Sequence, residues 1–450
     1  MDIASIDSVE GMEKSLLAAA NVALEDAARQ GAAMAEVSIG QGQGMSVTVR
    51  KGEVETVEHN RDKSIGITVF FGHKSGNASS TDFSESAIRA TVQSACNIAR
   101  YTEEDTFNGL ADPELMATEF LDLDLYHPWS ITMDGAIELA GRCEAAALDT
   151  DSRISNTEGA TVSSHDGIDL YANSHGFTGF SQGSRHSISC SVIAGEGENM
   201  QRDYWYDSRR KSQDLDAPEK IGLETAKRTV RRLGAGKIKT GEYPVIFEPS
   251  VSSSLISHLN SAISGSSLYR KASFLLDKKG EQIFPENINI YEQPFLKGAS
   301  GSAAFDAEGV ATRENRIVQN GVLQQYLLSS YSARKLGLST TGNAGGVHNL
   351  CLDSTLDGGL EEMIRSLNKG IVITELIGFG VNNVTGDYSR GAFGFYVEKG
   401  EIIRPVQEFT IAGNLIDMFQ KISAVGNDID KKRNIRCGSI MIDNLTVAGE

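Results

Sequence analysis

The first hundred residues combine two kinds of apolar spacing, and this combination limits the fold more than any other feature of the chain. Helical spacing predicts one helix over 10–30 and another over 84–101. Between them, apolar residues recur at every second position in three short stretches, 35–39, 45–49 and 65–69. Turn-like residues separate these stretches at 40–44, 51–52 and 60–63. We therefore predict an antiparallel meander with helices on one face.

The rest of the 450-residue chain continues this mixture of helices and strands. A polar stretch over 102–129 predicts a linker. A β-rich segment over 153–206 follows, flanked by predicted helices over 132–148 and 218–233. Glycine-punctuated strands are predicted at 243–247, 317–328, 371–374, 393–399 and 401–411. Two more helices are predicted over 250–263 and 360–367.

These elements predict an α+β fold in three parts. An N-terminal helix and antiparallel-sheet domain covers 1–110, a middle β-rich domain with helices covers 125–236, and a large mostly-β C-terminal domain covers 240–450. The chain has 46 glycines and only 8 prolines, which favours many tight turns in a β-rich protein.

Charge and cysteine content narrow the class of protein. Acidic residues outnumber basic ones by 60 to 42, giving a formal net charge of −18. Sequence-independent binding to nucleic acid or an anionic membrane needs excess Lys and Arg, so we expect neither as a partner. Five widely spaced cysteines without a C-x-x-C motif predict reduced thiols. No secretory signal or long apolar run is present, which predicts a cytoplasmic protein.

Motifs for metal or nucleophilic chemistry are weak. None of the eight histidines belongs to an H-x-x-x-H or H-E-x-x-H pattern. Histidines ten or eleven residues apart in the β-rich segment leave open either a metal site or ordinary strand positions: His165, His175 and His186. Ser332 and Lys335 fit the short S-x-x-K pattern, which chance alone produces in a chain of this length. The glycine-rich segment 40–44 lies between strands, so it predicts a hairpin turn rather than a phosphate loop.

The segment 385–391, Thr-Gly-Asp-Tyr-Ser-Arg-Gly, holds the densest set of polar functional groups. Asn382 and Asn383 lie just before it, and its flanking glycines allow close approach to another backbone. Two interpretations stay open. The loop binds a peptide main chain through Asn, Ser and Arg donors, or it is a structured turn in which Asp387 pairs with Arg390.

Several ordered segments resemble the TldD/PmbA family, and specifically its PmbA (TldE) branch. In the C-terminal part they are 269–277, 305–310, 330–338, 341–348, 385–391, 411–415 and 425–428. The N-terminal part, including Val-Glu-Thr-Val at 54–57, also resembles the family's helix-and-strand domain. The resemblance therefore covers nearly the whole chain.

The resemblance implies one half of a two-subunit metalloprotease. TldD and PmbA chains pair around a chamber that admits unfolded or leader peptides, and an older family label is modulator of DNA gyrase. The catalytic TldD branch carries a His-Glu-x-x-x-His helix that binds zinc. The matching positions here are Ser257, His258 and Ala262. The resemblance thus implies no catalytic or metal-binding residue in this chain, with zinc in the TldD-type partner of a heterodimer.

The candidate peptide-channel or interface residues follow from the resemblance and the polar segment. They are His258, Arg270, His348, Asn382, Asn383, Asp387, Tyr388, Ser389 and Arg390. For Arg270 we favour structural pairing with a neighbouring acid over contact with peptide. One alternative is a metallopeptidase in its own right, a homodimer using a cluster of His258, His348 and Cys437. A third possibility is a non-proteolytic regulator of gyrase. The isolated chain is also a possible homodimer.

Overall fold

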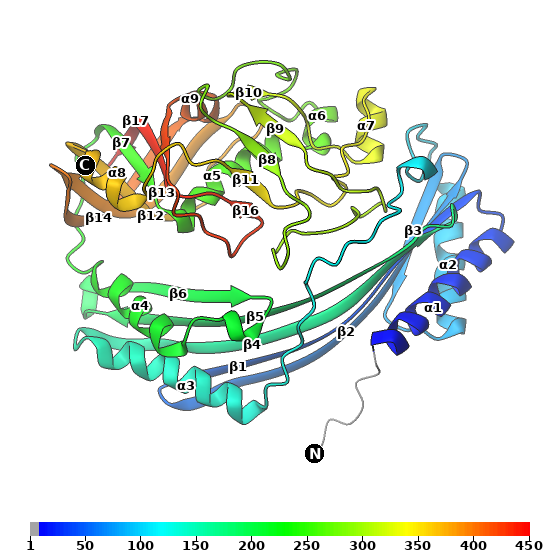
Figure 1. Cartoon of the computed structure of the whole chain (residues 1–450), viewed down its shortest axis with the longest axis horizontal. Coiled ribbons are helices and arrows are strands. Elements are labelled where there is room, and N and C mark those ends of the chain that lie inside the picture. The colour runs from blue at the N-terminus through cyan, green and yellow to red at the C-terminus, as the bar shows by residue number, and fades with distance from the viewer. Residues whose placement is uncertain (1–8) are drawn as a thin grey trace.

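The computed structural model describes residues 9–450. Residues 1–8 lie outside the described part. The prediction that the N-terminal segment holds no secretory signal falls partly on these residues. A long curved sheet carries helices on its outer face, and the C-terminal part lies over its inner face (Figure 1). The predicted α+β fold is confirmed. Within residues 9–450, no helix is long and apolar enough to cross a membrane.

The sheet contains six antiparallel strands in the order β3-β2-β1-β4-β5-β6. Their bounds are β1 Met34–Arg50, β2 Glu53–Phe71, β3 Lys74–Ser80, β4 Ile154–Asn173, β5 Thr178–Ala194 and β6 Gln201–Arg209. Four of them run for 17 to 20 residues, against about 5–6 in a typical strand. The predicted N-terminal and middle parts therefore contribute neighbouring strands to one sheet.

Four helices cover one face of this sheet and bury two separate cores. At one end, α1 (Val9–Arg29) and α2 (Glu85–Tyr101) pack Leu16 and Val92 against β1, β2 and β4. At the other end, α3 (Met133–Thr150) and α4 (Pro218–Val230) pack Cys143 and Ile221 against β4 and β5. All four helices are found where the sequence predicts them, α1 and α2 from their apolar spacing and α4 from Pro218 at its first turn.

Two turns predicted within the first sheet are wrong. Residues 40–44 and 60–63 lie inside β1 and β2, and the two strands pair along their whole length. Gly40 and Gly44 face away from the helices, and a Cβ at either would collide with Asp169 or Asn60 of a neighbouring strand. These glycines make room for side chains rather than for a turn. The predicted turn at 51–52 is confirmed, since both residues have positive φ.

The polar stretch 102–129 is an extended strap between the sheet and the C-terminal part. It contains one short 3-10 helix, Pro113–Leu115. The backbone N–H of Ala117 donates to the carbonyl of Gly309 at 3.0 Å, while the carbonyl of Leu125 accepts from Ser184 on β5 at 2.9 Å. The strap therefore bonds both to the six-stranded sheet and to the C-terminal part. Two further 3-10 turns, Gly197–Asn199 and Ser212–Asp214, flank β6.

The C-terminal part contains two more sheets. The larger has the order β14-β13-β12-β7-β17-β15: Glu401–Asn414, Asp387–Glu398, Lys369–Ile377, Gly241–Phe247, Ile440–Ala448 and Ile422–Val425. The smaller has the order β10-β9-β8-β11-β16: Val322–Leu323, Arg316–Gln319, Ile290–Glu292, Leu350–Leu352 and Ile435–Arg436. The helices are α5 Pro249–Ala262, α6 Gly265–Tyr269, α7 Ser330–Leu336, α8 Leu360–Ser366 and α9 Leu415–Gln420. One large core, including Phe247, Phe284 and Phe419, joins these elements.

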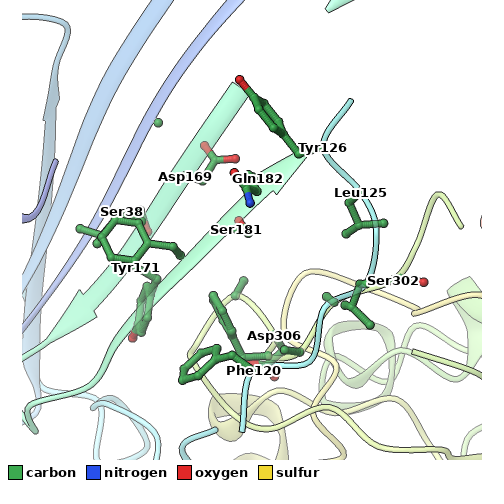
Figure 2. A pocket seen from close by; sticks show the side chains of 18 of the residues that line it. Ser38, Phe120, Leu125, Tyr126, Asp169, Tyr171, Ser181, Gln182, Ser302 and Asp306 are labelled. Carbon is green, nitrogen blue, oxygen red and sulfur yellow. The ribbon is translucent and has the colours of Figure 1, made fainter. Parts of the chain in front are cut away.

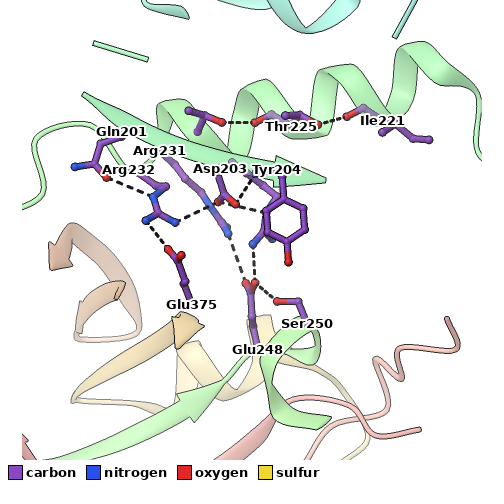
Figure 3. A network of polar contacts seen from close by, with 12 residues as sticks. Gln201, Asp203, Tyr204, Ile221, Thr225, Arg231, Arg232, Glu248, Ser250 and Glu375 are labelled. Atoms are coloured by element: carbon purple, nitrogen blue, oxygen red, sulfur yellow. Dashed lines mark hydrogen bonds and ion pairs between the residues drawn. The ribbon is translucent and has the colours of Figure 1, made fainter. Parts of the chain in front are cut away.

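A buried ionic network fastens α4 to the C-terminal part (Figure 3). Arg228 donates to Glu248 at 2.9 Å, and Arg231 lies 3.5 Å from the same carboxylate. Arg232 pairs with Glu375 on β12 at 2.6 Å. Because these arginines belong to the middle part and Glu248 and Glu375 to the C-terminal part, these pairs fix how the two meet. Asp203 on β6 adds contacts within the middle part, at 3.5 Å and 3.6 Å from Arg228 and Arg232.

Candidate functional site

Helix α5 carries the positions at which the resemblance requires zinc ligands. It follows β7 directly, begins at Pro249 and buries Leu255 and Leu259 in the C-terminal core. The hydroxyl of Ser257 donates to the carbonyl of Ser254 at 2.6 Å, and Ala262 is fully buried. A serine hydroxyl held in this way and a methyl group are not zinc ligands.

His258 is held as a neutral imidazole. Its ring lies edge-to-face on Tyr388, with centroids 5.9 Å apart and an interplanar angle of 78°. Burial lowers the pKa of His258 to about 4, and the charge of Arg390 acts in the same direction. Among the described residues, the ring finds no hydrogen-bond partner for its buried Nε2 atom.

Tyr388 and Arg390, both on β13, complete a group that we call the His258 cluster (His258, Tyr388 and Arg390). Burial raises the pKa of Tyr388 to about 12, so the phenol keeps its proton at neutral pH. One Arg390 nitrogen donates to the carbonyl of Leu376 at 3.4 Å. By distance and angle, the Tyr388 hydroxyl and Arg390 Nε have no hydrogen-bond partner in the part of the chain that the structure describes, although the Arg390 guanidinium lies near enough to the phenol to act against the rise in its pKa. Several unsatisfied polar atoms in one place are unusual in a packed core and favour a functional role.

The polar segment 385–391 is a loop only at its start, because residues 387–391 are the first residues of β13, so the expectation of a loop is wrong for them. The turn before that strand is ordered by hydrogen bonds, but the predicted ion pair between Asp387 and Arg390 is not formed. Asp387 accepts a hydrogen bond from Thr385 at 2.6 Å. Among residues 9–450, no carboxylate oxygen lies within 4.0 Å of the Arg390 side chain. Asn382 accepts from the backbone of Val384 at 2.9 Å. Asn383 donates to the carbonyl of Ala272 at 2.9 Å, which ties the turn to the end of α6.

Two other candidates near this turn have exposed side chains. Ser389 is exposed on β13, and its backbone N–H donates to the carbonyl of Gly380 at 2.6 Å. Arg270 is also exposed and lies 3.4 Å from the hydroxyl of Tyr269. The expected pairing of Arg270 with an acid is wrong, because no carboxylate oxygen of residues 9–450 lies within 4.0 Å of the Arg270 side chain.

His348 supports a buried carboxylate. Its backbone N–H donates to Glu292 at 2.8 Å, and its ring bonds to the carbonyl of Gly342 at 3.1 Å. Glu292 is completely buried and also accepts from Asn315 and Asn343, at 2.7 Å and 2.9 Å. The segment 341–348 is therefore a rigid turn organised around Glu292, a residue that the sequence did not single out.

A polar cavity of about 530 Å³ adjoins these elements. The end of α5 (Asn260 and Ser261), the serines of α6 and the turn 343–346 line it. Asn383 reaches Ser267, one of the lining serines, at 3.4 Å. The run Ser264-Gly-Ser-Ser267 is the one sequence signal for this cavity, and nothing in the apolar spacing marks it as a site.

The remaining motif candidates are structural. Ser332 forms the capping box of α7 with Ser329, while Lys335 pairs with Asp105 on the strap at 3.1 Å, so the S-x-x-K residues have separate roles. His186 is buried, with its ring nitrogens bonded to Ser164 at 2.9 Å and to the carbonyl of His127 at 2.8 Å.

The residues present offer no zinc site of the kind that the resemblance implies for the catalytic TldD branch. Across residues 9–450, no group of three or more His, Cys, Asp or Glu side chains could hold a metal ion. The proposed cluster of His258, His348 and Cys437 is therefore wrong. Cys437 lies 3.2 Å from the hydroxyl of Ser252, and burial raises the pKa of its thiol to about 12. We assign no step to a metal in this chain.

A larger cavity lies between the sheet and the C-terminal part. It measures about 620 Å³, and Figure 2 shows it between Asp169 and Ser181 on the sheet, Phe120 and Tyr126 on the strap, and the loop that contains Asp306. Gly40 lies beneath the Asp169 carboxylate. Of the glycine-rich segment 40–44, Gly40 alone lines this cavity, and its lack of a side chain makes room there for the Asp169 carboxylate.

Family models match the chain in three consecutive parts. They are PmbA/TldA metallopeptidase domain 1 over 35–99, the central domain over 126–233 and the C-terminal domain over 240–449. Metalloprotease PmbA of Escherichia coli O157:H7 is 49% identical, over 99% of this chain and 98% of its own length. The chain belongs to the PmbA/TldD family, in its PmbA (TldE) branch.

Other comparisons agree with this placement. The metalloprotease PmbA homolog of Haemophilus influenzae is 47% identical over 98% of each chain. A crystal structure of a Bacteroides thetaiotaomicron protein that is described as a modulator of DNA gyrase has a TM-score of 0.92 and 30% identity. That match covers 98% of this chain and 100% of the solved one. The resemblance seen in the separate segments therefore extends to the whole fold.

Proposed function

We propose that this chain is the non-zinc subunit of a cytoplasmic TldD/PmbA-type metalloprotease complex. It completes the chamber of a TldD-like catalytic subunit and binds the unfolded or leader peptides that the complex cleaves. The observation that carries this proposal is α5, where Ser257, His258 and Ala262 stand at the ligand positions and Arg390 adds positive charge beside His258. A guanidinium next to a neutral imidazole suits a peptide oxygen better than a divalent cation.

The end of β12 and the loop 378–386 that follows it, up to β13, support a partner subunit at this site. Ile377, Phe379 and Val384 are 55%, 99% and 53% exposed. The loop is ordered by hydrogen bonds from Asn382 to Asp387 and from Gly386 to Asn382, each at 2.8 Å. Apolar side chains that an ordered loop holds in water are typical of a protein interface.

Co-expression with a TldD-type subunit tests the proposal. The chain purified alone should carry less than roughly one-tenth of an equivalent of zinc and should not cleave unfolded casein, because it lacks the ligand pair. With the partner, it should co-purify as a heterodimer, and cleavage should be chelator-sensitive.

The alternatives predict different results from the same preparations. Close to one equivalent of zinc, with chelator-sensitive cleavage by the chain alone, would make it a metallopeptidase that acts as a homodimer. Capture of gyrase without capture of a TldD-type chain would make it a non-proteolytic regulator.

A further inference from the structure

A pocket of about 310 Å³ concentrates basic residues in this acidic chain. It lies between the middle of β5, the end of β6 with the turn after it, the strap and two loops of the C-terminal part. Seven basic and two acidic residues line it, whereas the chain as a whole has a net charge of −18. The pocket therefore reverses the sign of charge that dominates the rest of the molecule.

Most of these positive charges have no acidic partner. Five residues have no carboxylate oxygen within 4.0 Å in the described part of the chain: Arg185, Arg210, Lys297, Lys431 and Lys432. Of the acids, Asp124 is already engaged by Lys211 and His127, each at 2.8 Å. The pocket thus presents positive charge that the protein itself leaves uncompensated.

Arg210 shows that this arrangement is built into the fold. The guanidinium is half-buried and donates to the carbonyls of Ser184 and Ser300, each at 3.0 Å. Burial lowers the pKa of Arg210, and the neighbouring charge of Arg185 lowers it further. A bound anion would remove this unfavourable interaction between like charges.

The pocket is tied to the candidate site through α5. Lys432 lies over the rings of Trp205 and Tyr206, at 4.2 Å and 4.7 Å. The adjacent Arg433 reaches the hydroxyl of Ser253 at 3.5 Å. Ser253 precedes His258 by five residues, which is about 7–8 Å along an α-helix.

We infer that this pocket binds carboxylate side chains of an acidic peptide segment. This inference rests on the proposed function, because that function brings extended peptides to α5. A volume of about 310 Å³ suits a few side chains rather than a nucleic-acid duplex. Since the molecule is acidic elsewhere, it repels such a segment from other surfaces and holds it at this pocket.

Two matched peptides test this inference on the full chain without its partner. Both are flexible 12-residue sequences, with either three glutamates or three glutamines at the centre. Fluorescence anisotropy at low salt should show about tenfold tighter binding of the glutamate peptide, as expected for one or two charge-assisted hydrogen bonds. The preference should fall as salt is raised.

The double variant Lys297→Gln/Lys431→Gln removes two exposed, unpaired charges of the pocket and should abolish the preference. The control Lys14→Gln/Lys220→Gln changes net charge equally at exposed lysines elsewhere and should keep it. Equal binding of both peptides, no binding of either, or a preference that survives in the pocket variant overturns the inference. Tighter binding of inorganic phosphate than of the glutamate peptide, or pocket-dependent binding of duplex DNA, also overturns it. Assembly with the TldD-type subunit is measured separately, so the two proposals fail independently.

Discussion

Burial shifts the pKa of three side chains in the C-terminal part, so each keeps its uncharged form over a wider pH range than it would in water. His258 is kept neutral by burial and by Arg390, while the Tyr388 phenol and the Cys437 thiol are kept protonated by burial. In each case the dominant cause is the loss of solvent around the charged form. These groups therefore serve as hydrogen-bonding or packing groups at neutral pH, and none of them is an ionised nucleophile.

The depressed pKa of His258 predicts a contribution to acid sensitivity. An unfolded histidine protonates near pH 6.5, whereas folded His258 protonates near pH 4, so the unfolded state binds more protons between these values. The free energy of unfolding should thus fall as pH drops from about 6.5 to about 4. His258→Asn should show a smaller fall in thermal midpoint over this range. The same substitution at the exposed His59 is the control for loss of an imidazole, and equal pH curves for the two variants would contradict the shift at His258.

Glu248 predicts a large loss of stability at the junction of the two halves. The carboxylate is 4% exposed and is shared by Arg228 and Arg231. Glu248→Ala removes the nearer acid from the buried Arg228 and leaves only Asp203, at 3.5 Å, at a cost of about 3–5 kcal/mol in denaturant unfolding. Glu361→Ala removes an exposed pair with Arg365 and should cost about 0–1 kcal/mol. Similar losses in the two variants would show that the network contributes no more than a surface pair.

At the scale of elements, two glycines on neighbouring helices have opposite roles. Gly222 on α4 lies so close to α3 that a Cβ would collide with the carbonyl oxygen of Cys143. Gly141 on α3 has nothing within 4 Å of the position of a Cβ. The first glycine therefore sets the separation of the two helices, and the second does not.

Alanine at these two positions should change stability in opposite directions. Gly222→Ala forces α3 and α4 apart and should cost about 1–3 kcal/mol, because backbone cannot move aside as a flexible side chain can. Gly141→Ala should gain up to about 1 kcal/mol from helix propensity. The denaturant midpoint of each variant measures the effect. Stabilisation of both would mean that the helices separate at little cost.

The elements also show what the sequence could and could not predict. Apolar periodicity located α2 to within a residue, because a helix is a local pattern. The glycines at 40–44 wrongly predicted a turn inside what is the continuous strand β1, since glycine marks turns more often than it marks strands. The deciding contact comes from Asp169, more than a hundred residues away. His258 and Arg390 were chosen for separate reasons, and only the packing of α5 beside β13 brings them together.

The whole molecule is two halves, the six-stranded sheet with its helices and the C-terminal part, joined by polar contacts and by a small apolar cluster that includes Tyr171, Phe177 and Val310, with cavities between them. The α4 network joins them at one end, and the strap bonds to both along its length. Between these connections lie the cavity beside Asp169 and the basic pocket. The five segments that line the basic pocket run from the strap to the last loops of the chain, so no local pattern could have revealed it. The α4 network and the strap are already engaged within the chain, so a partner subunit binds to other surfaces.

Phe379 offers a direct measure of that assembly. Its side chain is 99% exposed on the ordered loop beside the His258 cluster, so Phe379→Ser should leave the thermal midpoint of the isolated chain unchanged. If the TldD-type subunit covers this loop, the lost burial of a phenylalanine should weaken the heterodimer by about 1.5–3 kcal/mol, or roughly tenfold to hundredfold in Kd. Tyr101→Ser, at a residue 91% exposed at the end of α2, is the matched control and should not change Kd. Equal Kd for both variants would place the interface elsewhere, while the zinc measurement would still test the identity of the subunit.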